Sequence, residues 1–121
     1  MTDDSFTPRS AHVCVNHQKA GILTELKRGY HYQFLYLPDY EGSSISLTMP
    51  VRSEPYIYDR FPPFFDGLLP EGNHLEALLR QVKLDRDDYF SQLIAVGKDM
   101  VGAVSVVGIS SWIDVNPSGN S

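Results

Sequence analysis

Hydrophobic and polar residues alternate with a period of two through the first third of the chain, which predicts antiparallel β-strands. The predicted strands cover residues 12–15, 21–27 and 30–37. Asn and His at 16–17 and Arg and Gly at 28–29 are expected to make the two connecting turns, because glycine adopts a positive φ without strain. The three strands therefore form an antiparallel meander.

A fourth short strand is predicted over residues 45–49, where apolar residues alternate with Ser and Thr until Pro50 ends the pattern. Residues 51–63 contain three prolines, two tyrosines and one phenylalanine, and they show neither a helical period nor a sustained period of two. We therefore expect an irregular loop with exposed aromatic side chains.

Helical periodicity begins after this loop. Residues 64–69 predict one helical turn, and Pro70 is expected at the first position of the next helix, where its missing N–H would be unpaired anyway. In that helix apolar residues recur at i, i+3, i+4 and i+7, which predicts a stripe that faces the core. The stripe consists of Leu75, Leu78, Leu79 and Val82.

One acidic residue among Asp85, Asp87 and Asp88 is expected to cap a third helix by accepting hydrogen bonds from its free N–H groups. The inner face of this helix consists of Phe90, Leu93 and Ile94. Gly97 is expected to end it, and a returning strand covers residues 101–107. The fold class is therefore α+β: a small antiparallel sheet, either an open meander or barrel-like, packed with two to three helices.

The length of 121 residues fits one domain. We assign this domain to residues 11–113 and expect flexible ends at residues 1–10 and 114–121, which are mostly polar. The N-terminus lacks the apolar segment of a secretory signal, and no apolar run approaches the roughly 20 residues of a membrane helix. We therefore expect no membrane association.

The charge balance restricts the class of partner. Ten Lys and Arg against fifteen Asp and Glu give a net charge of −5, and the longest basic run is Lys27-Arg28. Nucleic-acid binding needs clustered basic residues, so direct binding is not expected, whereas an acidic surface suits a basic partner. Cys14 is the single cysteine, which precludes an intrachain disulfide and favours a reducing compartment, the cytoplasm.

Candidate catalytic chemistry finds little support in the sequence. No histidine lies at i, i+4 from another with a nearby acid, and with one cysteine no zinc ligand set is complete. The carboxylates of the second half lie mainly at helix starts, where capping accounts for them. Phosphoryl transfer needs a phosphate loop and catalytic aspartates, and no such motif occurs. We expect no enzyme, no catalytic residue, no metal and no cofactor.

Four segments in order resemble the N-terminal subdomain of the HipA family of bacterial Ser/Thr kinase toxins. The most specific are FFDGLLPEG at residues 64–72 and GKDMVGAVSVV at residues 97–107. The opening VCVNHQKAGILTELKRGYHYQFLYLPDY and the strand-like SISLTMP at residues 44–50 are similar to the family's first strands. Two departures are Asn73-His74, where larger residues are common, and Met100, where a cysteine is frequent.

The resemblance implies a binding module, because the chain ends where the kinase core of the family would begin. Some operons of this family encode a short kinase, a DNA-binding protein and a small protein similar to the detached subdomain. The chain resembles that small HipS-like antitoxin, which implies a HipA-like Ser/Thr kinase as its partner and a HipB-like DNA-binding protein in a ternary complex. Alternatives are a regulatory fragment of a full-length HipA-like toxin, and a small-ligand-binding protein or enzyme.

Candidate contacts to the partner lie mainly in the 51–63 loop. Tyrosine, tryptophan and arginine dominate protein-binding hot spots, and prolines in this loop lower the entropy lost on docking. The candidates are Tyr56, Tyr58, Arg60 and Phe61, together with Trp112 near the C-terminus. The alternatives are that the loop aromatics fold back over the 64–69 turn and that the tryptophan only caps the edge of the sheet.

Overall fold

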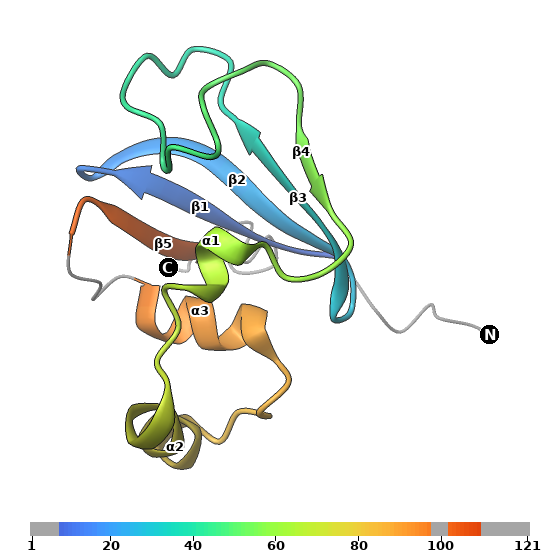
Figure 1. Ribbon diagram of the computed structural model, residues 1–121, viewed down its shortest axis with the longest axis vertical. Coiled ribbons are helices and arrows are strands. Elements are labelled where there is room, and N and C mark those ends of the chain that lie inside the picture. The colour runs from blue at the N-terminus through green and yellow to red at the C-terminus, as the bar shows by residue number, and fades with distance from the viewer. Residues whose placement is uncertain (1–7, 98–101, 110–121) are drawn as a thin grey trace, which may run out of the picture.

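A five-stranded antiparallel sheet with the strand order β4-β3-β2-β1-β5 organises the fold (Figure 1). The computed structural model describes residues 8–97 and 102–109 of the chain. Its elements are β1 (Arg9–Val15), β2 (Gln18–Lys27), β3 (Tyr30–Tyr36), β4 (Tyr56–Tyr58), α1 (Pro63–Asp66), α2 (Gly72–Val82), α3 (Tyr89–Gly97) and β5 (Val104–Ile109). The α+β class and the meander of the first three strands are confirmed.

Two tight turns connect the meander, as expected from the sequence. Asn16 and His17 both have positive φ, 51° and 70°, which matches the right-handed twist of a two-residue hairpin. Gly29 provides a φ of 82° between β2 and β3. The second turn sets one register along the whole of β2 and β3, whereas the register of β1 against β2 shifts at an irregularity between Val13 and Cys14.

The sheet is open rather than barrel-like. β5 pairs antiparallel with β1, with Val106 opposite Val13, and β4 pairs only with β3 at the other edge. The two edge strands therefore do not meet, and the barrel-like alternative is wrong. A three-residue strand at one edge is too short to continue the ladder around.

One face of the sheet forms the core beneath α1 and α3. Tyr32 and Phe34 of β3 are fully buried there, together with Phe65 of α1 and Phe90 and Leu93 of α3. The ring centroids of Phe34 and Phe65 lie 6.0 Å apart, so α1 packs against β3 on this face of the sheet. The inner face predicted for the third helix is confirmed.

Residues 45–49 form a turn and not the predicted strand. The N–H of Met49 donates to the carbonyl of Ser46 at 3.1 Å, and the Tyr36 hydroxyl binds both the N–H of Ile45 and the carbonyl of Met49. Ile45 and Met49 are buried, whereas Leu47 at the turn is fully exposed. Apolar residues do alternate between buried and exposed positions here. The backbone N–H and carbonyl groups, however, bind the Tyr36 hydroxyl and each other within the turn, and not a neighbouring strand.

The loop at residues 51–63 is more ordered than expected. It contains β4, which pairs with β3 through Phe34 opposite Tyr56 and Tyr32 opposite Tyr58. Tyr56 and Phe61 are each only 9% exposed, so the expectation of exposed aromatics is wrong for these two residues. Cross-strand neighbours that lie far away in sequence decide this burial.

The stripe on α2 does not face the core, which corrects the second helical prediction. None of the residues of α2 is buried, and α2 lies apart from the sheet, below α3 in Figure 1. The helix begins at Gly72, two residues after the predicted start at Pro70. The space under the sheet is already filled by α1 and α3, so no core surface is left for the stripe.

α3 and β5 approach each other closely where Gly97 ends the helix. A Cβ built at Gly97 would lie 2.3 Å from the carbonyl oxygen of Val106, and one at Gly108 would lie 3.0 Å from the Ile94 side chain. A side chain at position 97 would therefore push the strand away.

Among the described residues no helix is long and apolar enough to cross a membrane.

Candidate functional site

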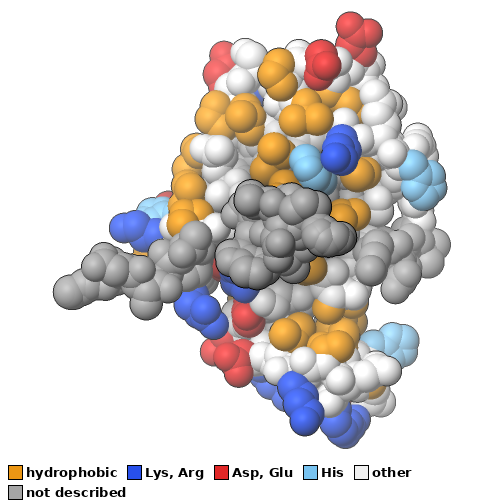
Figure 2. All heavy atoms as spheres, turned by 180° about the vertical axis from the view of Figure 1, so that it is seen from behind, with side chains coloured by type: hydrophobic (Ala, Val, Ile, Leu, Met, Phe, Trp, Pro, Cys, Tyr) orange, Lys and Arg blue, Asp and Glu red, His pale blue; other side chains and the backbone are white. Residues whose placement is uncertain are grey.

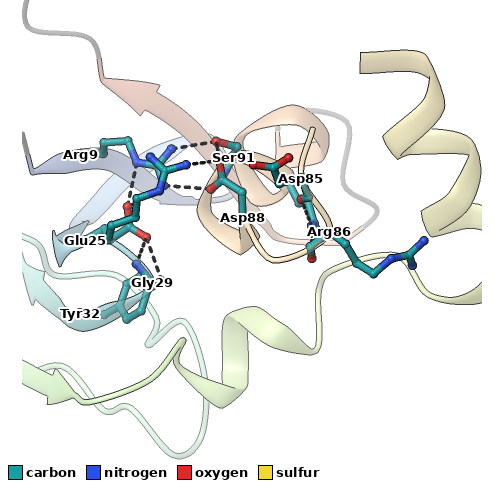
Figure 3. A network of polar contacts seen from close by, with 10 residues as sticks. Arg9, Glu25, Gly29, Tyr32, Asp85, Arg86, Asp88 and Ser91 are labelled. Carbon is teal, nitrogen blue, oxygen red and sulfur yellow. Dashed lines mark hydrogen bonds and ion pairs between the residues drawn. The ribbon is translucent and has the colours of Figure 1, made fainter. Parts of the chain in front are cut away.

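A buried polar cluster joins the sheet to the start of α3 (Figure 3). Arg9 of β1 lies at its centre, with Nε donating to Oε1 of Glu25 at 2.8 Å and Nη2 donating to Oδ1 of Asp88 at 2.9 Å. Nη1 donates to the Ser91 hydroxyl at 2.8 Å. One guanidinium thus connects β2 with the first turn of α3.

The second oxygen of Glu25 is also paired. Oε2 accepts from the Tyr32 hydroxyl at 2.9 Å and from the N–H of Gly29 at 3.1 Å. The Glu25 side chain is 2% exposed, so each of these bonds offsets part of the cost of burying a charge. A carboxylate with partners on both oxygens is suited to holding a fold together and has no free oxygen for acid–base chemistry.

The ionisation of the cluster follows from these contacts. Burial raises the pKa of Asp88, but hydrogen bonds from Arg9 and Ser91 outweigh it and leave the pKa below its ordinary value. Burial lowers the pKa of Arg9, but its bonds to Asp88 and Glu25 raise it above the ordinary value. Burial and the bond to Glu25 raise the pKa of Tyr32. At neutral pH the pair of Arg9 and Asp88 is therefore charged and the tyrosine is not.

Asp88 also caps α3, which confirms the expected acidic cap. Its Oδ1 accepts from the N–H of Ser91 at 3.2 Å, and the Ser91 hydroxyl donates to Oδ2 at 2.7 Å. The amide of the buried Gln92 donates to the carbonyls of Asp85 and Arg86, which holds the segment that leads into the helix. The cap and this segment therefore position α3 against the sheet.

An open cavity of about 470 Å³ lies beside the cluster, lined by Glu25, Arg28, Gly29, Asp85, Arg86, Asp87 and Asp88. Its charges have both signs, and two of its carboxylates already bind Arg9. Within residues 8–97 and 102–109 no three His, Cys, Asp or Glu side chains group in a way that could hold a metal ion. The hydrogen bonds of the polar cluster join β1, β2, β3 and α3.

Two of the predicted partner contacts lie in the core. Phe61 meets Tyr32 edge-on at 5.3 Å between ring centroids and lies 5.7 Å from Tyr89. The Tyr56 hydroxyl donates to the carbonyl of Pro50 at 2.6 Å, and the Arg52 guanidinium lies 3.6 Å over the Tyr56 ring. These aromatics fold back onto the domain, but the ring contacts of Phe61 are with β3 and α3 and not with the 64–69 turn that the alternative named.

The other predicted contacts remain accessible or undescribed. Tyr58 is half-buried and Arg60 is exposed, while Trp112 lies outside the described residues. Sequence reasoning missed Ile57, which is 60% exposed between two inward-pointing tyrosines. The period of two over Tyr56 to Tyr58 was the signal that could have found it.

A second surface that sequence reasoning missed is the apolar stripe of α2, called the α2 stripe below: Leu75, Leu78, Leu79 and Val82. None of these residues belongs to the core or to the partly buried residues packed against it, and Val82 is 43% exposed. Figure 2 shows Lys and Arg side chains gathered at the end of the molecule that α2 forms, with hydrophobic side chains directly above them. Leu75, Leu78 and Leu79 are half-buried, so the stripe that the sequence shows is partly exposed outside the core.

Comparisons with known proteins agree on one family. A family profile described as HipA N-terminal domain matches residues 11–107. An uncharacterized protein of Haemophilus influenzae is 38% identical over 100 residues, which are 81% of this chain and 91% of that protein. "Putative kinase Y4mE" of Sinorhizobium fredii is 29% identical over 79 residues, which are 65% of this chain and 19% of that protein. A solved structure titled "N-terminal domain of HipA toxin" superposes with a TM-score of 0.66 at 30% identity, covering 91% of this chain and 98% of the other.

Proposed function

The chain belongs to the HipA N-terminal domain family, and from this we propose that it is an antitoxin that binds and inhibits a HipA-like Ser/Thr kinase toxin supplied as a separate chain. The HipA N-terminal domain is a non-catalytic subdomain, which supports a binding role rather than a reaction. The resemblance to the small HipS-like antitoxin also implies a HipB-like DNA-binding protein, which we include in the proposed complex.

The observation that carries the proposal is that this domain occurs in proteins of two very different sizes. The 100 residues aligned with the Haemophilus protein are 91% of it, so that relative is about 110 residues long and consists almost entirely of this domain. The match to the Sinorhizobium protein covers only 19% of a much longer chain that is named as a kinase. A domain found both within a kinase-named chain and nearly alone supports a partnership between separate chains.

The polar cluster is consistent with a binding module. Both oxygens of Glu25 and the carboxylate of Asp88 are occupied by hydrogen bonds within the chain. These residues stabilise the contact between the sheet and α3 and leave the recognition of a partner to surface side chains. The function therefore depends on what the surface presents.

We place one partner contact at the loop around β4. Arg60 is exposed and Ile57 is 60% exposed, while Tyr58 is half-buried, with one side packed against the core. Tyr56 and Phe61 fix the loop from inside, which lowers the entropy lost when a partner docks. Trp112 remains a second proposed contact.

The match to the Sinorhizobium protein favours a second candidate, a regulatory domain within a longer HipA-like kinase. The two candidates differ in whether the kinase lies in the same chain. Mass spectrometry of the protein purified from its native host separates them. A mass of about 13.6 kDa supports the antitoxin, and a much larger mass supports the regulatory domain.

The direct test is a kinase assay with purified proteins. A purified HipA-like kinase, the proposed partner, is incubated with ATP·Mg²⁺, and its autophosphorylation is followed while this protein is titrated in. We expect a stable complex and loss of activity at a stoichiometric ratio. A kinase that neither binds this protein nor loses activity in its presence contradicts the proposal.

A further inference from the structure

We infer that the α2 stripe is a docking surface for the kinase and that it occupies an apolar groove on that partner. The inference rests on the proposed function and adds the surface that carries it. The residues Leu75, Leu78, Leu79 and Val82 repeat at i, i+3, i+4 and i+7, the pattern by which an amphipathic helix fills a hydrophobic groove.

The stripe has no use within the described fold. The core cluster includes residues from the strands, α1 and α3, yet no residue of α2, and the same holds for the partly buried hydrophobic residues packed on that cluster. Helices in proteins gain most of their stability from packing an apolar face. Within the described residues the apolar face of α2 is left out of the core, and we assign it to the partner.

α2 is held in its helical form by local contacts instead. The N–H of Lys83, which has left-handed φ and ψ of 57° and 47°, donates to the carbonyl of Leu79 at 2.8 Å and closes the C-terminal end. Arg86 forms an ion pair with Glu76 at 2.8 Å, which ties the following loop back to the helix. A preformed helix loses little entropy on docking, because its backbone is already ordered.

Charge favours the kinase over a second copy of this chain as the occupant. Two copies would bring net charges of −5 together and repel each other. Arg80 and Lys83 lie in the last turn and at the C-terminal cap of α2, and within the described part of the chain no ion pair neutralises either of them. We therefore expect the groove on the kinase to be apolar with acidic residues next to the C-terminal end of α2.

The family relation supplies the second argument for the kinase. In the Sinorhizobium protein the matching domain is joined to a much longer chain, so the faces that the domain leaves uncovered are available to that chain. The α2 stripe, half-buried at its three leucines and 43% exposed at Val82, is the face that we assign to this contact. A separate kinase can cover it in the same manner.

The test compares two substitutions that place the same new side chain on the same helix. Leu79→Glu puts a carboxylate in the α2 stripe, whereas Ala77→Glu puts one on the exposed side of α2. Binding to the purified kinase is measured by calorimetry, and folding is checked by circular dichroism and the melting temperature. We expect Leu79→Glu to weaken binding by about 30-fold or more and Ala77→Glu to change it by less than about threefold.

Val82→Glu provides the same test without disturbing a half-buried leucine, because Val82 is 43% exposed. It is expected to remain folded and to weaken binding by at least about tenfold. Wild-type affinity in folded Leu79→Glu and Val82→Glu overturns the inference while the proposed function stands. A wild-type protein that does not bind the kinase overturns both. Loss of a wild-type dimer in these variants, with kinase binding unchanged, assigns the stripe to self-association and also overturns the inference.

Discussion

Arg9 and Asp88 lie 79 positions apart in the chain, yet Nη2 of Arg9 lies 2.9 Å from Oδ1 of Asp88. This contact joins the first strand to the first turn of α3. The same guanidinium binds Glu25, so a single arginine of β1 pairs with a carboxylate of β2 and with the carboxylate that caps α3. The position of α3 therefore depends on a pairing that is complete only when both ends of the domain have folded.

The first prediction is that Asp88→Asn lowers the free energy of unfolding at pH 7 by about 1–3 kcal/mol, because a charged hydrogen-bond acceptor is lost. Urea denaturation measures the effect. Asp87→Asn is the matched control, since Asp87 is exposed and should change the stability by less than about 0.5 kcal/mol.

The same variant should show a characteristic dependence on pH. The pKa of Asp88 is lowered in the folded state, so the folded protein binds this proton less tightly than the unfolded chain. The stabilisation is then present above the ordinary aspartate pKa of about 3.9 and is lost as the pH falls through the folded value. The difference between wild type and Asp88→Asn should shrink below about pH 4. A difference that persists undiminished at lower pH rules out this charge as its source.

The second prediction uses one substitution at two positions. Leu69 is 9% exposed in the core, so Leu69→Ala should cost about 2–5 kcal/mol through the cavity it leaves. Leu47 is 100% exposed, so Leu47→Ala should lie within about 0.5 kcal/mol of wild type. Denaturant melts of both variants make the comparison. Equal stabilities would mean that Leu69 packs elsewhere.

The third prediction concerns the contact between α3 and β5. Gly97→Ala should lower stability by about 1–3 kcal/mol, because the new Cβ would lie 2.3 Å from the carbonyl oxygen of Val106. Gly67→Ala is the control, since its Cβ would meet ordinary contacts at 3.5 Å and its φ of −66° suits alanine. Thermal unfolding of the pair tests the geometry. If the Gly97→Ala variant is as stable as the Gly67→Ala variant, α3 and β5 are not in close contact at Gly97.

The fourth prediction concerns the loop around β4. Tyr58→Ala should weaken kinase binding by about 2 kcal/mol or more, whereas Glu54→Ala, an exposed residue of the same loop, should not. Phe61→Ala should weaken binding as well, but it should also lower stability by about 3 kcal/mol because Phe61 is only 9% exposed. Calorimetry on folded protein separates the two effects. Unchanged affinity in Tyr58→Ala removes this loop from the interface.

The fifth prediction concerns nucleotide. The protein should neither bind ATP·Mg²⁺ in calorimetry nor transfer phosphate, because its sequence lacks the loop, lysine and aspartates that such chemistry needs. The partner kinase measured under the same conditions is the positive control. Calorimetry that shows ATP·Mg²⁺ binding to this chain alone at a stoichiometric ratio would contradict the prediction and favour an enzyme or a small-ligand-binding protein.

The sequence by itself determined the features that depend on near neighbours. The turn at Asn16 and His17 and the turn at Gly29 are two residues long, so their residue types decide the local backbone and, for β2 and β3, the register of the whole pair. Between β1 and β2 the turn sets only the pairs next to it, because the register shifts between Val13 and Cys14. The acidic cap of α3 follows in the same way, because Asp88 reaches an N–H only three residues away. The motif order that identifies the family is also a property of the sequence alone.

The tertiary structure alone decided which surfaces are covered. Periodicity states which residues of a helix share a face, and it cannot state whether another segment covers that face. Phe61 is buried because Tyr32 and Tyr89 lie beside it. The α2 stripe lies outside the core because Phe65 and Leu93 already fill the space under the sheet. Segments far apart in the chain compete for one limited core, and that competition is settled only when the whole domain packs.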